Sequence, residues 1–179
     1  MKIFNVLVFA LLSTFAINNV ALAQYDEAAE KTIVDIAVGS DDHTTLVAAL
    51  KAAGLVSALQ ADGPFTVFAP NNAAFEALPE GTVPALLKPE NKDQLTDILT
   101  YHVVSGSFDA AAVVKAIKDN DGMVALTALN GDELTAYLKN GSVYLKDAKG
   151  GTSKVIATDL KGSNGVIHVI ESVIMPEGK

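Results

Sequence analysis

The chain of 179 residues contains no cysteine, no tryptophan and no arginine. Without cysteine it forms no disulfide, thiolate metal site, thiol nucleophile or redox pair, so its fold must hold without covalent cross-links. All 13 basic residues are lysines, and the formal net charge is −8. This acidic balance, with no guanidinium group, argues against nucleic acid as a partner and against docking on anionic lipid. We expect the charge to serve solubility.

Catalytic and metal-binding motifs are missing as well. The sequence has no Gly-x-Ser-x-Gly elbow, no His-Glu-x-x-His pair and no phosphate-binding glycine loop. The run Asp41-Asp42-His43 gathers ligand types, but acidic residues at a helix start are expected as caps. Residues 119–122 fit part of a calcium loop, whereas Ile117 and Ala128 would occupy its first and last ligand places. We therefore expect no enzyme activity, no catalytic residues, no cofactor and no bound metal.

The N-terminal segment has the pattern of a signal peptide. Lys2 precedes an apolar run over 3–12, and Ala21-Leu22-Ala23 matches the small-x-small cleavage pattern. The apolar run is short for a membrane span, which makes an uncleaved anchor the less favoured alternative. We expect cleavage of residues 1–23 and a single mature domain over 24–179, with its core at about 31–176. The protein is then secreted, periplasmic or extracellular, and is not inserted in a membrane.

Hydrophobic periodicity predicts helices in the first half of the chain and strands in the second, which is the α+β pattern. Apolar residues at helical spacing predict helices over 25–40, 43–53, 82–87, 91–100 and 110–118. Alternating or β-branched runs predict strands over 65–68, 123–129, 134–139, 142–146, 154–158 and 166–174. Asn71 or Asn72 is expected to cap the helix that follows the first strand, and Asp109 the last helix.

Asn140-Gly141 predicts a two-residue hairpin turn of type I′. That turn places Lys139 opposite Ser142 and Tyr137 opposite Tyr144, and directly opposite residues share a face. One face of the hairpin is then apolar and belongs to the core. The other face is polar and carries the two tyrosines. Asn140-Gly141-Ser142 also matches a glycosylation sequon, but the turn explains these residues better.

Three stretches in this order resemble the fasciclin domain family: Thr66-Val67-Phe68-Ala69-Pro70 with Ala74-Phe75, then Tyr101-His102-Val103-Val104, then 164–170. The family usually has threonine where this chain has Asn71, which is also a good cap. The resemblance implies a β-wedge of two small sheets flanked by several helices. It further implies cell adhesion or extracellular matrix contacts, and the single secreted domain is similar to bacterial members.

Tyr101 and His102 stand where the family has a Tyr-His motif linked to adhesion. A structural role is the favoured interpretation for His102, with its ring bonded near Asn71 or Asn72. His168 alternates with apolar neighbours and is expected on a sheet face. Tyr137 and Tyr144 form the best candidate contact surface, because tyrosine combines apolar area with a polar tip. The favoured interpretation of the pair is nevertheless structural, with the rings shielding the sheet or packing on the helix over 110–118.

These observations favour an exported, non-enzymatic adhesion domain with a protein or glycan partner on a cell surface or matrix. The alternative is a binding protein for a small apolar ligand or glycan, held in a cleft between helices and wedge. An enzyme of unknown chemistry is the least favoured hypothesis.

Overall fold

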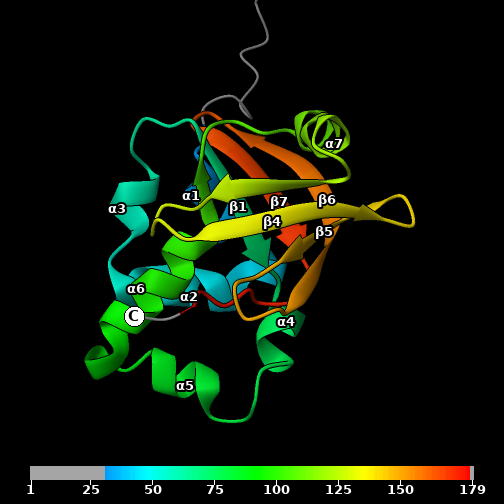
Figure 1. Ribbon diagram of the computed structural model, residues 1–179. Coiled ribbons are helices and arrows are strands. Elements are labelled where there is room, and N and C mark those ends of the chain that lie inside the picture. Colours follow the sequence, from blue (N-terminus) through cyan, green and yellow to red (C-terminus); the bar gives the residue numbers. More distant parts are fainter. Residues whose placement is uncertain (1–30, 178–179) are drawn as a thin grey trace, which may run out of the picture.

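The computed structural model describes residues 31–177 (Figure 1). The predicted signal peptide and the first part of the predicted helix over 25–40 lie outside these residues. The helices are α1 (Ile33–Val38), α2 (Thr44–Ala53), α3 (Val56–Leu59), α4 (Asn72–Glu76), α5 (Thr82–Leu86), α6 (Lys92–Tyr101) and α7 (Ala110–Asp119). The strands are β1 (Phe65–Pro70), β2 (Val103–Ser105), β3 (Met123–Thr127), β4 (Glu133–Lys139), β5 (Ser142–Lys146), β6 (Thr152–Gly162) and β7 (Gly165–Ile170).

The strands form a seven-stranded sheet in the order β2-β1-β7-β6-β5-β4-β3. Only β1 and β7 run parallel among these neighbours. The long strand β6 joins the two halves of the wedge, because its first residues pair with β5 and its remainder pairs with β7. A bridge between Val104 and Ala128 brings the two ends of the sheet together and nearly closes it. The α+β fold and the β-wedge with flanking helices are thus confirmed.

Side-chain caps fix where several helices begin. Thr32 and Asp35 form a capping box at α1, so this helix starts at Ile33, later than the sequence predicts. Asn71 accepts a hydrogen bond from the Ala74 amide, and Asp109 accepts one from the Ala112 amide, as predicted. These caps satisfy amide groups that have no partner inside their own helices.

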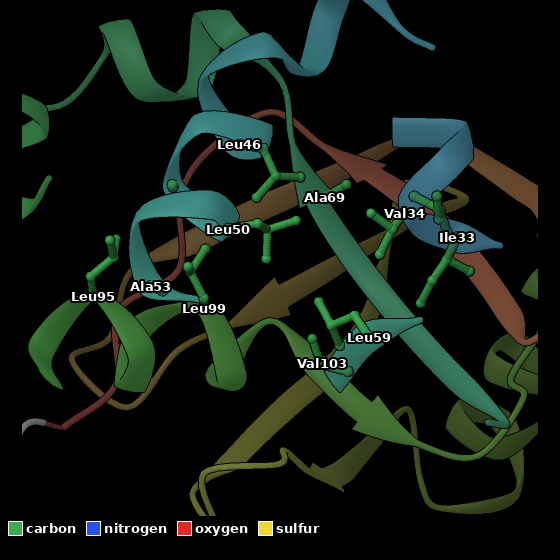
Figure 2. Close-up of a cluster of buried hydrophobic side chains, with 12 residues drawn as sticks. Ile33, Val34, Leu46, Leu50, Ala53, Leu59, Ala69, Leu95, Leu99 and Val103 are labelled. Atoms are coloured by element: carbon green, nitrogen blue, oxygen red, sulfur yellow. The ribbon is translucent and has the colours of Figure 1, made fainter. Parts of the chain in front are cut away.

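Strands β1 and β7 lie at the centre of the molecule and are covered on both faces. On one face, α1, α2 and α6 pack over them, and Figure 2 shows side chains of these helices gathered in one cluster with Ala69 of β1. On the other face, Phe68 and Ile170 meet side chains from α7, β4 and β5. Burial on both faces explains the nearly continuous apolar runs of these two strands.

The predicted strand over 166–174 ends early, at Ile170. Beyond it, the Glu171 amide still donates to the Lys154 carbonyl of β6 at 3.1 Å, but the amides of Ser172, Ile174 and Met175 are bonded to side chains. The Ser172 amide donates to Ser153 Oγ at 3.0 Å, and the Ser153 hydroxyl donates to the Ser172 carbonyl at 2.9 Å. Residues 171–177, the C-terminal strap, therefore run across the domain in an irregular path.

Candidate functional site

The hairpin between β4 and β5 has the predicted register. Asn140 and Gly141 both have positive φ, 52° and 78°, as a type I′ turn requires. Lys139 pairs with Ser142, and Tyr137 pairs with Tyr144. The inner face of the hairpin is fully buried at Leu134, Ala136 and Leu145. The register therefore turns the tyrosines toward the outside of the sheet.

The two tyrosine rings stack on this outer face. Their centroids lie 5.7 Å apart with an interplanar angle of 27°, and both rings are partly exposed. Lys139 Nζ lies 5.8 Å from the centre of the Tyr144 ring, within the range of a cation–π contact. Helix α7 packs on the opposite, inner face, where Val113 and Ile117 join the core cluster. The alternative in which the rings pack on this helix is therefore wrong.

Neighbouring strands extend this surface on both sides. Met123 of β3 lies directly opposite Tyr137, and Lys154 of β6 lies directly opposite Tyr144. The Met123 side chain is 59% exposed. The outer hairpin face, defined as Met123, Tyr137, Tyr144 and the lysines around them, thus spans four adjacent strands. Because β4 and β5 are paired along both edges, a partner can meet this face only through side chains.

Tyr101 and His102 lie in the interior, apart from the outer hairpin face. Tyr101 is fully buried; its hydroxyl donates to the Glu133 carbonyl at 2.9 Å and accepts from the Ala148 amide at 3.1 Å. His102 is also buried. Its Nδ1 donates to the Ile98 carbonyl at 2.8 Å, and its Nε2 accepts from the Ile174 amide at 3.2 Å.

The partners of His102 differ from the predicted ones. Asn71 is used in capping α4, and Asn72 bonds the Thr45 amide and the Asp41 carbonyl at the start of α2. His102 instead holds the last turn of α6 to the C-terminal strap. With a carbonyl on one nitrogen and an amide on the other, the ring is the neutral Nδ1–H tautomer.

Burial dominates the electrostatics of both residues. It lowers the pKa of His102 to about 4, against the opposing effects of the Ile98 hydrogen bond and the Asp147 charge. Burial likewise raises the pKa of Tyr101 to about 12. Both shifts favour the neutral forms that the hydrogen bonds require.

We expect acid to destabilise the fold through His102. Between pH 6.5 and about 4 the unfolded chain binds a proton at this ring and the folded chain does not. Stability from this group is complete above pH 6.5 and falls by about 3 kcal/mol in total as the pH drops to 4. Urea unfolding across this range checks the prediction. In His102→Gln, which can make both bonds but does not titrate, the fall should be shallower by that amount. Identical pH profiles would contradict it.

A second buried polar group, Asp147, was missed by the sequence analysis. Its Oδ1 accepts from the Lys149 amide at 3.0 Å and the Gly151 amide at 2.6 Å, and its Oδ2 accepts from the Met175 amide at 3.0 Å. The carboxylate therefore fixes both the turn after β5 and the C-terminal strap. Asp147 is 8% exposed, and the run Asp-Ala-Lys-Gly-Gly over 147–151 was the available signal of such a turn.

The other two histidines are buried too. His168 lies on a sheet face as predicted, stacked on Phe68 with centroids 5.7 Å apart, and its Nε2 donates to the Phe108 carbonyl at 2.7 Å. His43 Nδ1 lies 2.8 Å from Ser40 Oγ, and burial lowers the pKa of His43. Within residues 31–177, no three histidine, aspartate or glutamate side chains gather as a metal site would require.

Strand β6 presents a second exposed surface that the sequence did not reveal. Two register shifts between Val155 and Leu160 interrupt its pairing with β7, and the side chains of Ile156 and Leu160 are exposed. Asp159, with φ of 62°, turns its carboxylate to the Ala110 amide at 2.8 Å. The predicted strand over 154–158 is thus part of a longer, bulged one.

The described residues form two clefts on the surface and three small cavities in the core. A cleft of about 630 Å³ is lined by Asp62, Ser107, Asp109 and Lys161 among others. Another of about 700 Å³ lies between α6 and the C-terminal strap. Three apolar cavities in the core of the described residues measure about 20 Å³ or less, which is room for about one water molecule.

None of the helices described here has the length and apolar character needed to cross a bilayer.

The sequence model described as the fasciclin domain matches residues 41–176 of this chain. Protein sll1483 of Synechocystis is 54% identical over 145 residues, which cover 81% of this chain and 73% of that protein. The transforming growth factor-beta-induced protein ig-h3 of Sus scrofa is 37% identical over 150 residues, 81% of this chain and 19% of that protein.

A solved FAS1 domain pair from the insect cell adhesion molecule fasciclin I is similar in structure. The TM-score is 0.72 at 17% sequence identity, over 82% of this chain and 51% of that chain. At this identity the likeness speaks for the fold. With the family match over most of its length, the chain belongs to the fasciclin domain family.

Proposed function

We propose that this protein is an exported, non-enzymatic adhesion domain that contacts a protein or glycan on a cell surface or matrix. The contact is made by the outer hairpin face. The observation that carries this proposal is the Tyr137–Tyr144 pair, stacked and partly exposed on the strands of a two-residue hairpin. Membership of the fasciclin domain family, whose resemblance implied cell adhesion, supports adhesion as the general role.

Binding through the outer hairpin face should cost little side-chain conformational entropy. Tyrosine offers a large apolar ring and a hydroxyl, and it is enriched at protein interfaces. Here each ring is already ordered by its partner, so binding loses little further side-chain freedom. Met123 adds an exposed, flexible apolar side chain beside Tyr137.

A non-enzymatic role is supported by where the shifted pKa values lie. Catalytic sites commonly show such shifts among groups that converge on a cleft. Tyr101 and His102 instead face the interior and bond backbone groups of neighbouring segments. Their shifts follow from burial in packing that holds the fold.

The double change Tyr137→Ser with Tyr144→Ser tests the proposal. We expect adhesion to fall at least about tenfold, because two interface aromatics are lost. The melting temperature should change little, since a cross-strand aromatic pair contributes about 0.2–1 kcal/mol. Adhesion to matrix-coated plates and a thermal melt are the two measurements.

Ile156→Ser with Leu160→Ser is the matched control, because it removes two exposed apolar side chains from β6 instead. This control should keep most of its adhesion. If the tyrosine variant adheres normally per folded molecule, the outer hairpin face is not the contact surface and the rings serve the fold alone.

A second candidate is glycan binding in the cleft of about 630 Å³ at the ends of β6 and β7. Its size is in the range of ligand sites, and its hydroxyl, carboxylate and ammonium groups suit a hydroxylated ligand. The three apolar cavities in the core are too small for an organic ligand. NMR titration with oligosaccharides would support the candidate through shifts at Ser107 and Lys161, and unmoved resonances there would exclude it.

A further inference from the structure

The chain contains three Asn-Gly pairs, at Asn130, Asn140 and Asn164. In such a pair the glycine backbone nitrogen can attack the asparagine carboxamide carbon. The nitrogen loses its proton to solvent and its new C–N bond closes a succinimide ring. The bond between the carboxamide carbon and the side-chain nitrogen breaks, and that nitrogen takes a proton from solvent and leaves as ammonia. Water then opens the ring to aspartate or isoaspartate, and no oxidant or reductant is needed. The fold decides which of the three pairs can react.

Two of the three carboxamides are fully engaged. Asn130 donates to Asp97 Oδ1 at 3.3 Å and Asp132 Oδ2 at 2.8 Å, and its oxygen accepts from the Asp132 amide at 3.1 Å. The nitrogen of its glycine, Gly131, donates to the Ala128 carbonyl at 3.0 Å. Neither the electrophile nor the nucleophile of this pair is free.

Asn164 is held at least as firmly. Its amide donates to the carbonyls of Leu59 and Ala61 at 2.8 and 2.9 Å, and its oxygen accepts from the Ile33 amide at 3.0 Å. Gly165 is buried at the start of β7, paired with Gly162 on one side and Phe65 on the other. Reaction here needs these strand ends to separate.

Asn140 differs in every one of these respects. It is exposed at the tip of the hairpin, and within residues 31–177 its side chain makes no hydrogen bond. The Gly141 nitrogen lies between the two ladder partners Lys139 and Ser142 and has no backbone acceptor in the described chain. The space beside the Gly141 Cα is also open.

We propose that Asn140 is a site of spontaneous covalent modification, converting with water to aspartate and isoaspartate while Asn130 and Asn164 stay intact. The isoaspartate product lengthens the backbone by one carbon inside a two-residue turn. That turn sets the Lys139–Ser142 register, so the Tyr137–Tyr144 pair loosens with age. This consequence rests on the proposed function of the hairpin face, whereas the chemistry does not.

The experiment incubates the purified protein at mildly alkaline pH, folded and in urea, and follows each pair by peptide mass spectrometry. In the folded protein Asn140 should convert at least about tenfold faster than the other two, which must first open locally. In urea the three rates should converge. If Asn140 converts no faster than Asn130 or Asn164 in the folded protein, the proposal is wrong.

Asn140→Gly is the matched variant, because it keeps a turn that accepts positive φ and removes the reactive carboxamide. Aged wild type should lose near-ultraviolet tyrosine dichroism and adhesion, and the aged variant should keep both. Conversion at Asn140 with unchanged dichroism would overturn the loosening of the pair. Loosening without loss of adhesion would count against the proposed function instead.

Discussion

Replacing Asp147 by alanine is expected to lower the free energy of unfolding by about 3–5 kcal/mol, because three backbone amides lose a charged acceptor. These amides belong to Lys149, Gly151 and Met175, so both the turn after β5 and the C-terminal strap lose their common anchor. Urea unfolding gives the magnitude. Amide hydrogen exchange should show faster exchange at Gly151 and Met175 than in the wild type.

Asp147→Asn is the matched control, because it keeps the shape of the side chain and removes its charge. Its oxygen can still accept from the turn, but its NH₂ group would face the Met175 amide. We expect about half of the alanine effect, concentrated at the strap. A loss of stability below about 0.5 kcal/mol in both variants, the size of an ordinary surface substitution, would show that the carboxylate is not an anchor.

Gly165→Ala is expected to prevent folding. A Cβ at this position would lie 2.2 Å from the Phe65 carbonyl oxygen, and the obstacle is backbone in the central pair of strands. The β1–β7 pairing would have to separate, and both core clusters rest on those two strands. We expect a loss above about 5 kcal/mol, seen as an unfolded far-ultraviolet dichroism spectrum.

Gly150→Ala separates this steric effect from backbone strain. Gly150 has φ of 85°, but nothing lies within 4 Å of its added Cβ. This variant should lose only about 1–2 kcal/mol, the usual cost of a left-handed residue. Equal melting temperatures for the two alanine variants would contradict the claim that a Cβ at position 165 forces β1 and β7 apart.

Local signals explain what the sequence could predict. Asn140-Gly141 sets a turn with both φ values positive, and the alternation on either side then determines the whole hairpin register. Asp109 and Asn71 cap their helices through amides only three residues away. These contacts depend on neighbouring residues alone, so they can be read without the tertiary structure.

Long-range contacts explain what the sequence could not predict. The run over 166–174 reads as one strand, but at its end Ile174 meets His102, 72 residues earlier, and Met175 meets Asp147. His102 was predicted to lie near Asn71 or Asn72, but Asn71 caps α4 and Asn72 is used at the start of α2. No local pattern distinguishes these two sets of partners.

In the outer hairpin face, too, the local contacts could be predicted from the sequence and the long-range contacts could not. The pairing of Tyr137 with Tyr144 was predicted, since both lie within one hairpin. Met123 was not, because its place beside Tyr137 depends on the register of β3 across a separate turn. The alternative in which the tyrosine rings pack on α7 was wrong, because a helix can cover either face of a hairpin until the other strands are placed.

Hydroxyl-radical footprinting of the protein, free and attached to matrix or cell surface, tests the central claim most directly. It reads exposure side chain by side chain and does not depend on a variant that must fold. Attachment should protect Tyr137, Tyr144 and Met123, while Ile156 and Leu160 on β6 keep their free reactivity. Protection of Ile156 and Leu160 with unchanged labelling of the two tyrosines would contradict the assignment of the outer hairpin face as the contact surface.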